Sequence, residues 1–507
     1  MVDQDYDKVP VAEIQSEVDD GMQANDGRSD GSEKSTEDPA SEAPLQQERK
    51  VLTVDDAIEL LGMGKCQLLL SLAAGLCFAS DAMQIIMLSF LSKILKAEWK
   101  LSDSETALIT STLFTGAIFG TLILGSLADR KGRKPIFTIG AAIISFFGFG
   151  VGFVTTYWSL LVVLFIVGIG VGSATVPYDI LAEFLPAESR GKYLQLLNYY
   201  WTLGVLFVVV VAHITLGDGQ HKGSWTVFVQ LCALPCFLAL ILSLTIVPES
   251  PRWLCSQGRC DEALDIIRKA ADLNGLDPEF LFPEYVKLAE EEEEGSSFSE
   301  LFSSRWLWTT MKVLGTWAAF AFSYYGTVLI TTDVFDSTES NAEGNDTYNF
   351  DYSAIFVSSS SELIGITLIY FAIDTYGRIP LQAGSYALAG ICLFAFCTLA
   401  HYNAERTILV ALGFAARIFE MTGSIVTWVS TTEIFTTEVR STGHSTANAA
   451  AKIAILFVAF ITESEISMFY KGIVFLIVHA MAVIFVSQLP ETKGSHMGHH
   501  AIESQVD

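Results

Sequence analysis

Residues 125–134 read Gly125-Ser-Leu-Ala-Asp129-Arg130-Lys-Gly132-Arg133-Lys134, and a shorter copy, Ile373-Asp374-Thr-Tyr-Gly377-Arg378, lies in the second half of the chain. Each copy is a short charged stretch between two long apolar blocks. Its glycines permit a tight reversal and close packing of helix ends. A charged turn that recurs between apolar blocks indicates a helical membrane protein built from a duplicated unit.

The apolar blocks are long enough to cross a membrane. The chain has 507 residues, of which 51% are hydrophobic and only 17% are charged, whereas soluble proteins carry about a quarter charged residues. A helix of roughly 20 apolar residues spans a bilayer core. We therefore predict an all-α membrane protein with twelve transmembrane helices, and we exclude a soluble multidomain enzyme. The predicted spans are 68–91, 107–128, 136–155, 159–181, 194–216, 226–247, 308–331, 354–374, 382–401, 407–430, 444–463 and 468–489.

Three turn motifs recur in the same order, six spans apart. After the glycine-rich turn comes a Glu–Arg motif that follows spans four and ten, and then a Pro-Glu motif that follows spans six and twelve. Such repetition indicates two pseudo-symmetric six-helix bundles, an architecture that transporters use. The recurring residues are Glu183 and Arg190, matched by Glu433 and Arg440, and Pro248-Glu249, matched by Pro490-Glu491.

Polar segments divide the chain into five predicted parts. The formal charge of −27 is concentrated in residues 1–59 and in a second polar stretch around Glu290–Glu294. Acidic, weakly hydrophobic segments bury too little apolar surface to fold, and the lack of a basic patch argues against nucleic acid as a partner. The parts are a disordered acidic tail open to cytosolic partners (1–60), the first bundle (61–247), a linker with short helices such as 260–272 (248–307), the second bundle (308–490) and a C-terminal tail (491–507).

Lysine and arginine residues set the predicted orientation. They are concentrated in the turns after even-numbered spans and in the linker, which the positive-inside rule assigns to the cytosol. Both termini are then cytosolic. The loop 92–106, which carries three lysines, is the one dissenting segment. A glycosylation sequon at Asn345 falls in the predicted external loop between spans seven and eight, in agreement with this orientation.

The glycine-rich turn and the repeat are similar to the signature of the major facilitator superfamily. Within it, the segments 53–64 (TVDDAIELLGMG), 182–186 (AEFLP) and 322–329 (FSYYGTVL), together with Ser80-Asp81, resemble the synaptic-vesicle-2-related group, which is related to organic-ion and sugar porters. The resemblance implies a monomeric carrier in a eukaryotic plasma or vesicle membrane. A nucleophile–base pair, a phosphate-binding loop and a metal-ligand set are all missing from the sequence, so we expect no enzyme activity and no bound cofactor.

The recurring charges at the predicted cytosolic turns form a candidate gating network. We expect Arg133 to bridge to Glu183 and Glu249, and Arg378 to bridge to the corresponding glutamates. Asp129 is expected to face the positive N-terminus of a neighbouring helix. The resemblance implies that these contacts close the inner side during transport; alternatively, the basic residues only fix the orientation. The network comprises Asp129, Arg130, Arg133, Glu183, Arg190, Glu249, Arg252, Asp374, Arg378, Glu433, Arg440 and Glu491.

Ionisable residues inside the spans are candidates for the binding site, because burying a charge in a membrane is costly. Asp81 has no charged neighbour on its own helix, which favours a proton or organic-cation site over a structural hydrogen bond. Arg417 and Glu420 are three residues apart and can pair with each other. Residues 163–168 lack the arginine that many proton-coupled relatives place opposite such an aspartate, which argues against standard proton coupling. The candidates are Asp81, Asp179, Glu362, Arg417, Glu420 and Lys452.

Aromatic residues in the spans are a second set of candidates, although packing is the common role of any single one. Aromatic faces suit planar or cationic ligands. We predict a secondary active or facilitative transporter of a small polar organic solute, an organic ion rather than a sugar, with proton coupling left open. The alternatives are a hexose porter and a non-transporting membrane receptor. The aromatic candidates are Tyr199, Trp201, Tyr324, Tyr325 and Trp428, and spans 1, 4, 5, 7, 10 and 11 are expected to line the site.

Overall fold

The computed structural model describes residues 51–217, 223–289, 298–336, 349–435 and 437–493. The chain from Arg49 onward forms a single unit. The predicted disordered tail up to residue 50, the acidic run at 290–294 and the sequon at Asn345 lie outside the described residues, as does the end of the C-terminal tail.

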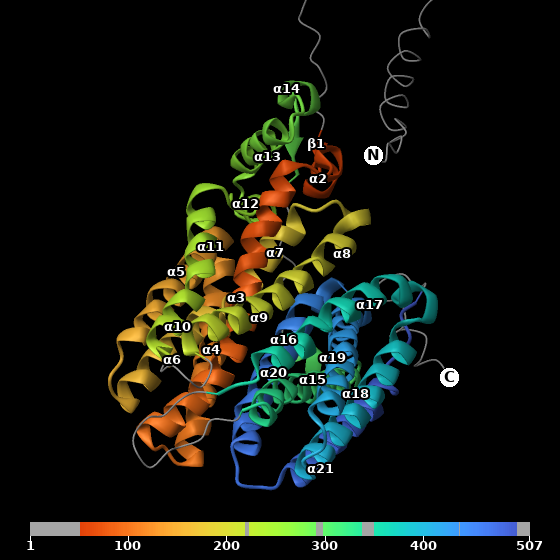
Figure 1. Cartoon of the computed structure of the whole chain (residues 1–507). Helices are drawn as coiled ribbons and strands as arrows, with labels where there is room; N and C mark the ends of the chain where they lie inside the picture. The colour runs from red at the N-terminus through yellow and green to blue at the C-terminus, as the bar shows by residue number, and fades with distance from the viewer. Residues whose placement is uncertain (1–50, 218–222, 290–297, 337–348, 436, 494–507) are drawn as a thin grey trace, which may run out of the picture. The chain divides into compact units, whose positions relative to one another are not determined.

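Within these described ranges, twelve helical segments are long and apolar enough to cross a membrane, as predicted. Figure 1 shows them as two bundles. The first bundle has α3 (Lys65–Trp99), α4 (Asp103–Lys131), α5 (Arg133–Gly150) continued by η1 (Val151–Phe153), α6 (Tyr157–Val171) with α7 (Thr175–Glu183), α8 (Ala187–Gln195) with α9 (Leu197–Leu216), and α10 (Trp225–Cys232) with α11 (Leu234–Thr245). The second has α15 (Leu307–Val334), α16 (Tyr352–Ser360) with α17 (Glu362–Tyr376), α18 (Arg378–His401), α19 (Arg406–Ile434), α20 (Thr437–Thr462) and α21 (Met468–Val486).

The first span is longer than predicted. The sequence placed its end at residue 91 and a loop at 92–106, but α3 continues to Trp99 and only three residues separate it from α4. Ile94 and Leu95 are fully buried in the core, so the apolar face of the helix continues past the lysines. A capping box between Ser102 and Glu105 then starts α4. The dissenting lysines at 93 and 96 therefore lie on a helix, where each has an acidic partner.

The repeated glycine turns join α4 to α5 and α17 to α18. Gly132 and Gly377 have φ values of +100° and +86°, which a side chain rarely adopts. A Cβ atom at either position would collide with the carboxylate of Glu249 or Glu491, respectively. Each turn thus needs its glycine for two reasons: the positive φ angle of the backbone, and the close approach of a glutamate carboxylate.

The linker folds against the start of the chain rather than standing apart. It contains α12 (Pro251–Ser256), α13 (Cys260–Asn274), α14 (Pro278–Leu281), β2 (Lys287–Leu288) and η2 (Phe298–Phe302). The helix expected at 260–272 is α13. β2 pairs in parallel with β1 (Val51–Leu52), with Val51 opposite Lys287. These elements gather at the same end of the first bundle as α2 (Val54–Leu61) (Figure 1).

The end of the predicted disordered tail is ordered, which corrects its boundary at residue 60. A capping box between Thr53 and Asp56 begins α2. Val54, Ala57, Ile58 and Leu61 follow helical spacing, and all four side chains are buried in one cluster with apolar residues of α13. An apolar stripe of this kind was visible among the acidic residues, but its packing partner lies some 200 positions away in the linker.

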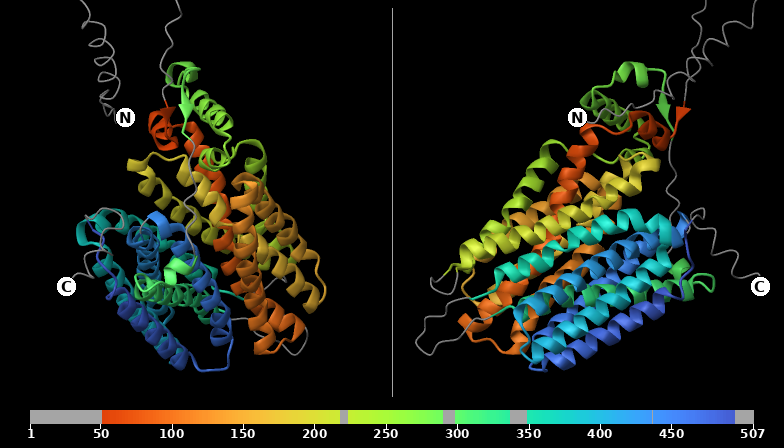
Figure 2. Two further views of the ribbon diagram at one scale, coloured as in Figure 1. Left: turned by 180° about the vertical axis from the view of Figure 1, so that it is seen from behind. Right: turned by 45° about the vertical axis from the view of Figure 1, so that its right-hand side comes forward.

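The two bundles meet along helices from both halves (Figure 2). α4 packs along α20, α9 along α16, and α3 crosses α15. We call the end that carries the glycine turns (residues 129–134 and 374–378) the motif face. The other end, where α3 gives way to α4 and α15 ends, is the opposite face.

Candidate functional site: a cavity between the two bundles

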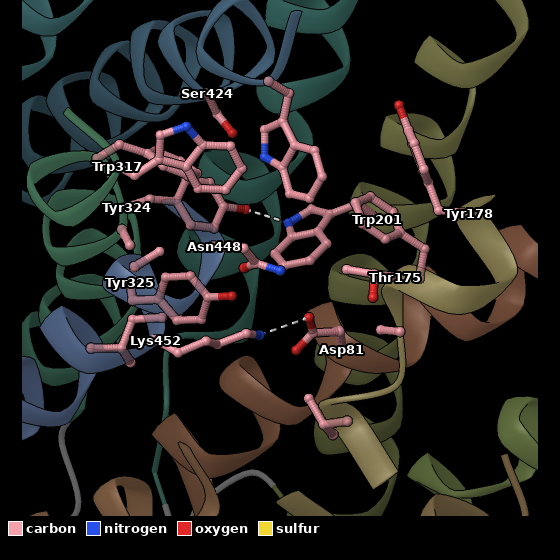
Figure 3. Close-up of a pocket in the computed structure, with 18 of the residues that line it drawn as sticks. Asp81, Thr175, Tyr178, Trp201, Trp317, Tyr324, Tyr325, Ser424, Asn448 and Lys452 are labelled. Carbon is pink, nitrogen blue, oxygen red and sulfur yellow. Dashed lines mark hydrogen bonds and ion pairs between the residues drawn. The ribbon is translucent and has the colours of Figure 1, made fainter. Parts of the chain in front are cut away.

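A cavity lies between the bundles (Figure 3), and its space of about 810 Å³ includes volume that is open to solvent. Side chains from α3, α4, α7 and α9 line it on one side, and side chains from α15, α19 and α20 line the other. The predicted lining spans 1, 4, 5, 7, 10 and 11 are all present, and span 2 contributes Thr121 in addition. Both halves therefore hold whatever occupies this cavity.

The two charged residues of the lining face each other across the halves. Asp81 of α3 accepts a hydrogen bond from the Lys452 ammonium of α20, with 3.3 Å between Oδ2 and Nζ. Both residues are buried, at 7% and 6% exposure. The sequence left Asp81 without a charged neighbour, because its partner is 371 positions away in the other half. Lys452 also lies 5.8 Å from the centre of the Phe114 ring, within cation–π range.

Aromatic rings form most of the remaining surface. Trp201 of α9 donates a hydrogen bond to the Tyr324 hydroxyl of α15, at 2.6 Å (Figure 3). Trp317 and Trp428 lie with ring centres 4.9 Å apart, and Trp317 donates to Thr431 at 2.8 Å. The indole N–H groups of Trp201 and Trp317 are thus occupied, and ring faces remain for a ligand. Such faces suit planar or cationic groups.

The structure separates the predicted binding residues into two groups. The first group lines the cavity and comprises Asp81, Trp201, Tyr324, Tyr325, Trp428 and Lys452. The second group lies outside the lining: Asp179 is exposed, the Tyr199 hydroxyl is 3.0 Å from Thr367 Oγ1, and three residues, Glu362, Arg417 and Glu420, lie behind the cavity wall. Trp317 and Phe320 were missed, although with Tyr324 they follow the helical spacing of one face of α15.

A buried ion pair supports the wall behind Tyr324. The Tyr324 hydroxyl donates to Glu362 Oε1 at 2.9 Å, and Thr202 donates to Glu362 Oε2 at 2.9 Å. Arg417 lies 3.2 Å from the same carboxylate, and both charged side chains are almost fully buried. Since Thr202 belongs to the first half, this network also joins the two bundles. The sequence allowed a pair between Arg417 and Glu420, but the Arg417 guanidinium pairs with Glu362 of α17 instead.

Glu420 pairs with His479, a residue that the sequence did not single out. Glu420 Oε1 is 2.7 Å from His479 Nε2, and the Phe475 carbonyl is 2.7 Å from His479 Nδ1. A carbonyl can only accept, so Nδ1 carries a proton. The other contact needs one more proton, which sits either on the ring, giving an imidazolium beside a carboxylate, or on Glu420. The pair is therefore a buried place where a proton can be held in the second half.

The opposite face is closed by contacts that cross between the halves. Lys93 of α3 lies 2.6 Å from Asp333 and 3.1 Å from Glu463, and all three side chains are largely buried. Lys471 approaches Asp333 from the other side, at 3.5 Å. The Ser89 and Thr332 hydroxyls are 2.9 Å apart one turn closer to the cavity. We call Lys93, Asp333, Glu463 and Lys471 the outer charge cluster.

The motif face carries ion pairs that stay within each half. Arg133 pairs with Glu183, and both Nε and Nη2 of Arg378 donate to Glu433, at 2.9 and 2.8 Å. The second glutamate of each set binds backbone instead of guanidinium. Glu249 accepts from the N–H groups of Arg133 and Lys134, and Glu491 accepts from those of Arg378 and Ile379, at 2.8 to 3.1 Å.

These two glutamates therefore cap the N-termini of α5 and α18, which suits the positive end of a helix dipole. Burial raises the pKa of Glu491, but the four backbone N–H groups around it lower the pKa further, so its carboxyl titrates below the usual range. The expected double bridges from each arginine are replaced by one ion pair and one helix cap.

The other predicted gating residues have varied surroundings. Arg190 and Arg252 both pair with Asp55 of α2, which ties α2 to the motif face. Asp129 and Arg130 are exposed, and the Asp129 carbonyl accepts from the Trp253 indole at 2.7 Å. Arg440 is half-buried, and burial lowers its pKa. The side chain of Asp374 lies outside the described residues.

The cavity, the paired bundles and the repeated turns define a carrier-type membrane protein. The family described as "Sugar (and other) transporter" matches residues 52–501, and the chain belongs to this family. The protein is a membrane transporter of the major facilitator type, related to the synaptic-vesicle-2-related group.

Relatives and solved structures agree with that assignment. The synaptic vesicle 2-related protein of Pongo abelii is 30% identical, with 81% of this chain and 75% of that protein covered. The organic cation/carnitine transporter 7 of Arabidopsis thaliana is 29% identical, with 79% and 86% covered. The fold resembles the partially occluded inward-open xylose transporter XylE from E. coli, with a TM-score of 0.67, 22% identity, and 87% and 100% covered.

Proposed function

We propose that this transporter moves a small polar organic ion by alternating access, in a plasma or vesicle membrane and with the motif face in the cytosol. The single observation that carries the proposal is the aromatic cavity with its Asp81–Lys452 pair, formed jointly by the two halves. A ligand bound there touches both bundles, so their relative movement can expose it to either side. The Arabidopsis relative is named as an organic cation/carnitine transporter, and this name supports an organic ion as the solute.

The closed opposite face supports a state that opens toward the cytosol. The outer charge cluster joins the halves at one end, while the Arg–Glu pairs of the motif face leave them unlinked at the other. During transport the outer charge cluster opens as the motif face closes. In a proton-coupled mechanism the His479–Glu420 pair holds the coupled proton. In an uncoupled uniporter the pair has no such role.

A hexose is the second candidate. Asn198 and Asn448 line the cavity, and amide groups can donate to and accept from sugar hydroxyls. The family description and the xylose transporter of known structure support it. Ser323-Tyr324-Tyr325, with two buried aromatic rings in span seven, favours a planar or charged solute instead.

The test is uptake by the full-length protein in proteoliposomes, with radiolabelled organic cations, organic anions and hexoses and with or without a pH gradient. We expect saturable uptake of an organic ion that Asp81→Asn reduces by at least about tenfold, since a buried lysine then loses its counter-ion. Asp103→Asn, on the opposite face, is the matched control. Hexose uptake alone selects the second candidate. No uptake of any solute, with one fixed conformation, favours a non-transporting receptor.

A further inference from the structure

The charge balance of the cavity restricts the solute more narrowly than its size does. Of the residues that line it, only Asp81 and Lys452 carry formal charge, one from each half, and the sum is zero. The rest of the lining consists of aromatic, aliphatic, amide and hydroxyl side chains. Any charge that a solute brings must therefore be balanced by these two residues.

The pair is also incompletely satisfied. Its N–O distance of 3.3 Å exceeds the roughly 2.7–2.9 Å of a strong charged hydrogen bond. The second carboxylate oxygen, Asp81 Oδ1, is buried and has no hydrogen-bond partner among the residues that the structure describes. An ammonium has three N–H donors, and the one hydrogen bond described for the Lys452 ammonium is that to Asp81.

The outer charge cluster shows what a satisfied pair looks like in the same protein. There a single lysine, Lys93, contacts two carboxylates at 2.6 and 3.1 Å. It also joins the two halves, and it lies outside the cavity. The Asp81–Lys452 contact is thus longer than either contact of Lys93 and is the one that a ligand in the cavity can reach, and each of its members can form further hydrogen bonds.

A solute with one charge leaves an uncompensated charge in the cavity. An organic cation that binds Asp81 displaces Lys452 and leaves its ammonium unpaired, and an organic anion does the reverse to Asp81. Leaving a buried charge without a partner is strongly unfavourable. A solute with both charges instead pairs its cation with Asp81 and its anion with Lys452, and it leaves the site neutral.

We infer that this cavity takes a zwitterion: a small organic molecule whose cationic group binds Asp81 and whose anionic group binds Lys452. This inference rests on the proposed function and narrows its solute class. Trp201 and Tyr324 offer ring faces for an alkylated cation or a planar linker between the two charges. Because Asp81 and Lys452 belong to different halves, the zwitterion also replaces the electrostatic link that it breaks.

The experiment compares matched probes on the purified full-length protein by equilibrium binding and thermal shift. One series is γ-aminobutyric acid, butylamine, butyric acid and butyramide. A second, planar series is para-(aminomethyl)benzoic acid, benzylamine, benzoic acid and benzamide. In at least one series we expect the zwitterion to bind at least about tenfold more tightly than each analogue. A singly charged analogue leaves one of the two site charges without a partner, and the neutral amide cannot replace the ion pair that it displaces.

Three variants then change the preference in a defined order. Asp81→Asn leaves only the lysine, so the anionic analogue becomes the tightest ligand. Lys452→Gln leaves only the aspartate, so the cationic analogue does. The double variant has no charge in the lining and loses preference for charged probes, and it also guards against misfolding because it leaves neither charge unpaired. The control double variant, Asp103→Asn with Lys96→Gln, removes an ion pair on the opposite face and keeps the wild-type order.

Several outcomes overturn the inference. It fails if a singly charged or neutral analogue binds as tightly as the zwitterion in both series, if neither zwitterion binds, or if the variants leave the order unchanged. Uptake of a simple cation or anion in proteoliposomes, without zwitterion binding, overturns it while the proposed function stands. The absence of transport of any solute removes the proposed function itself.

Discussion

The two bundles match closely at the motif face and differ inside the membrane. At the motif face, Arg133–Glu183 and the Glu249 cap of the first half correspond to Arg378–Glu433 and the Glu491 cap of the second. Inside, the first half contributes Asp81 to the buried network. The second half contributes Glu362, Arg417, Glu420, Lys452 and His479.

This difference separates two kinds of charge. Charges that recur in both halves hold helix ends and turns, a task that each bundle has in common. The charges buried at the level of the cavity occur in one half only, and two of their contacts cross between the halves: Lys452 with Asp81, and Glu362 with Thr202. The duplication therefore explains the fold. The buried charges that lack a counterpart in the other half indicate where the solute binds.

The largest expected effect comes from breaking the unrepeated ion pair of the second half. Arg417→Met leaves the Glu362 carboxylate buried without its counter-ion, and we expect a loss of about 3–5 kcal/mol in stability. Thermal unfolding of the purified protein measures it. The double variant Arg417→Met with Glu362→Gln should recover most of the loss, because no unpaired charge remains. If the single variant is as stable as the wild type, the pair has no structural role.

Breaking the outer charge cluster should shift conformation more than stability. Lys93→Met leaves Asp333 and Glu463 without their shared cation and removes a link between the halves. We expect a rise of about tenfold in labelling of Ser89→Cys by a membrane-impermeant thiol reagent from outside, since losing one partner of a buried pair costs about 2 kcal/mol or more. Lys96→Met, one turn away with a partly exposed partner, is the control. Equal labelling in both variants would show that Lys93 does not hold this face closed.

The sequence predicted the repeated part of the molecule well and the unrepeated part poorly. Twelve spans, two halves and the arginine–glutamate pairs followed from apolar block length and from motifs that occur twice. The partner of Asp81 did not, because Lys452 is 371 positions distant and has no counterpart in the other half. Glu249 and Glu491 were expected to bind guanidinium groups, whereas their carboxylates bind backbone N–H groups, which a residue pattern does not reveal.

His479 illustrates the same limit. A lone histidine in an apolar span has no periodic or motif signal, and its role depends on Glu420 of another helix and on the carbonyl of Phe475. The end of the acidic tail shows the converse. The apolar stripe of α2 is present in the sequence among many acidic residues, and its contact with α13 is what makes this segment fold.

The smallest expected effect tests whether the repeated caps are equivalent. Glu249→Gln and Glu491→Gln each weaken one helix cap, and we expect similar losses of about 1 kcal/mol in thermal unfolding. Because the backbone N–H groups hold the pKa of Glu491 below its ordinary value, its carboxylate stabilises the folded state above that ordinary value. The stabilisation is lost as the pH falls through the lowered pKa. The difference between wild type and Glu491→Gln should therefore be full at pH 7 and shrink in acid. Unequal losses at pH 7 for the two variants would mean that the halves differ at the motif face as well as inside the membrane.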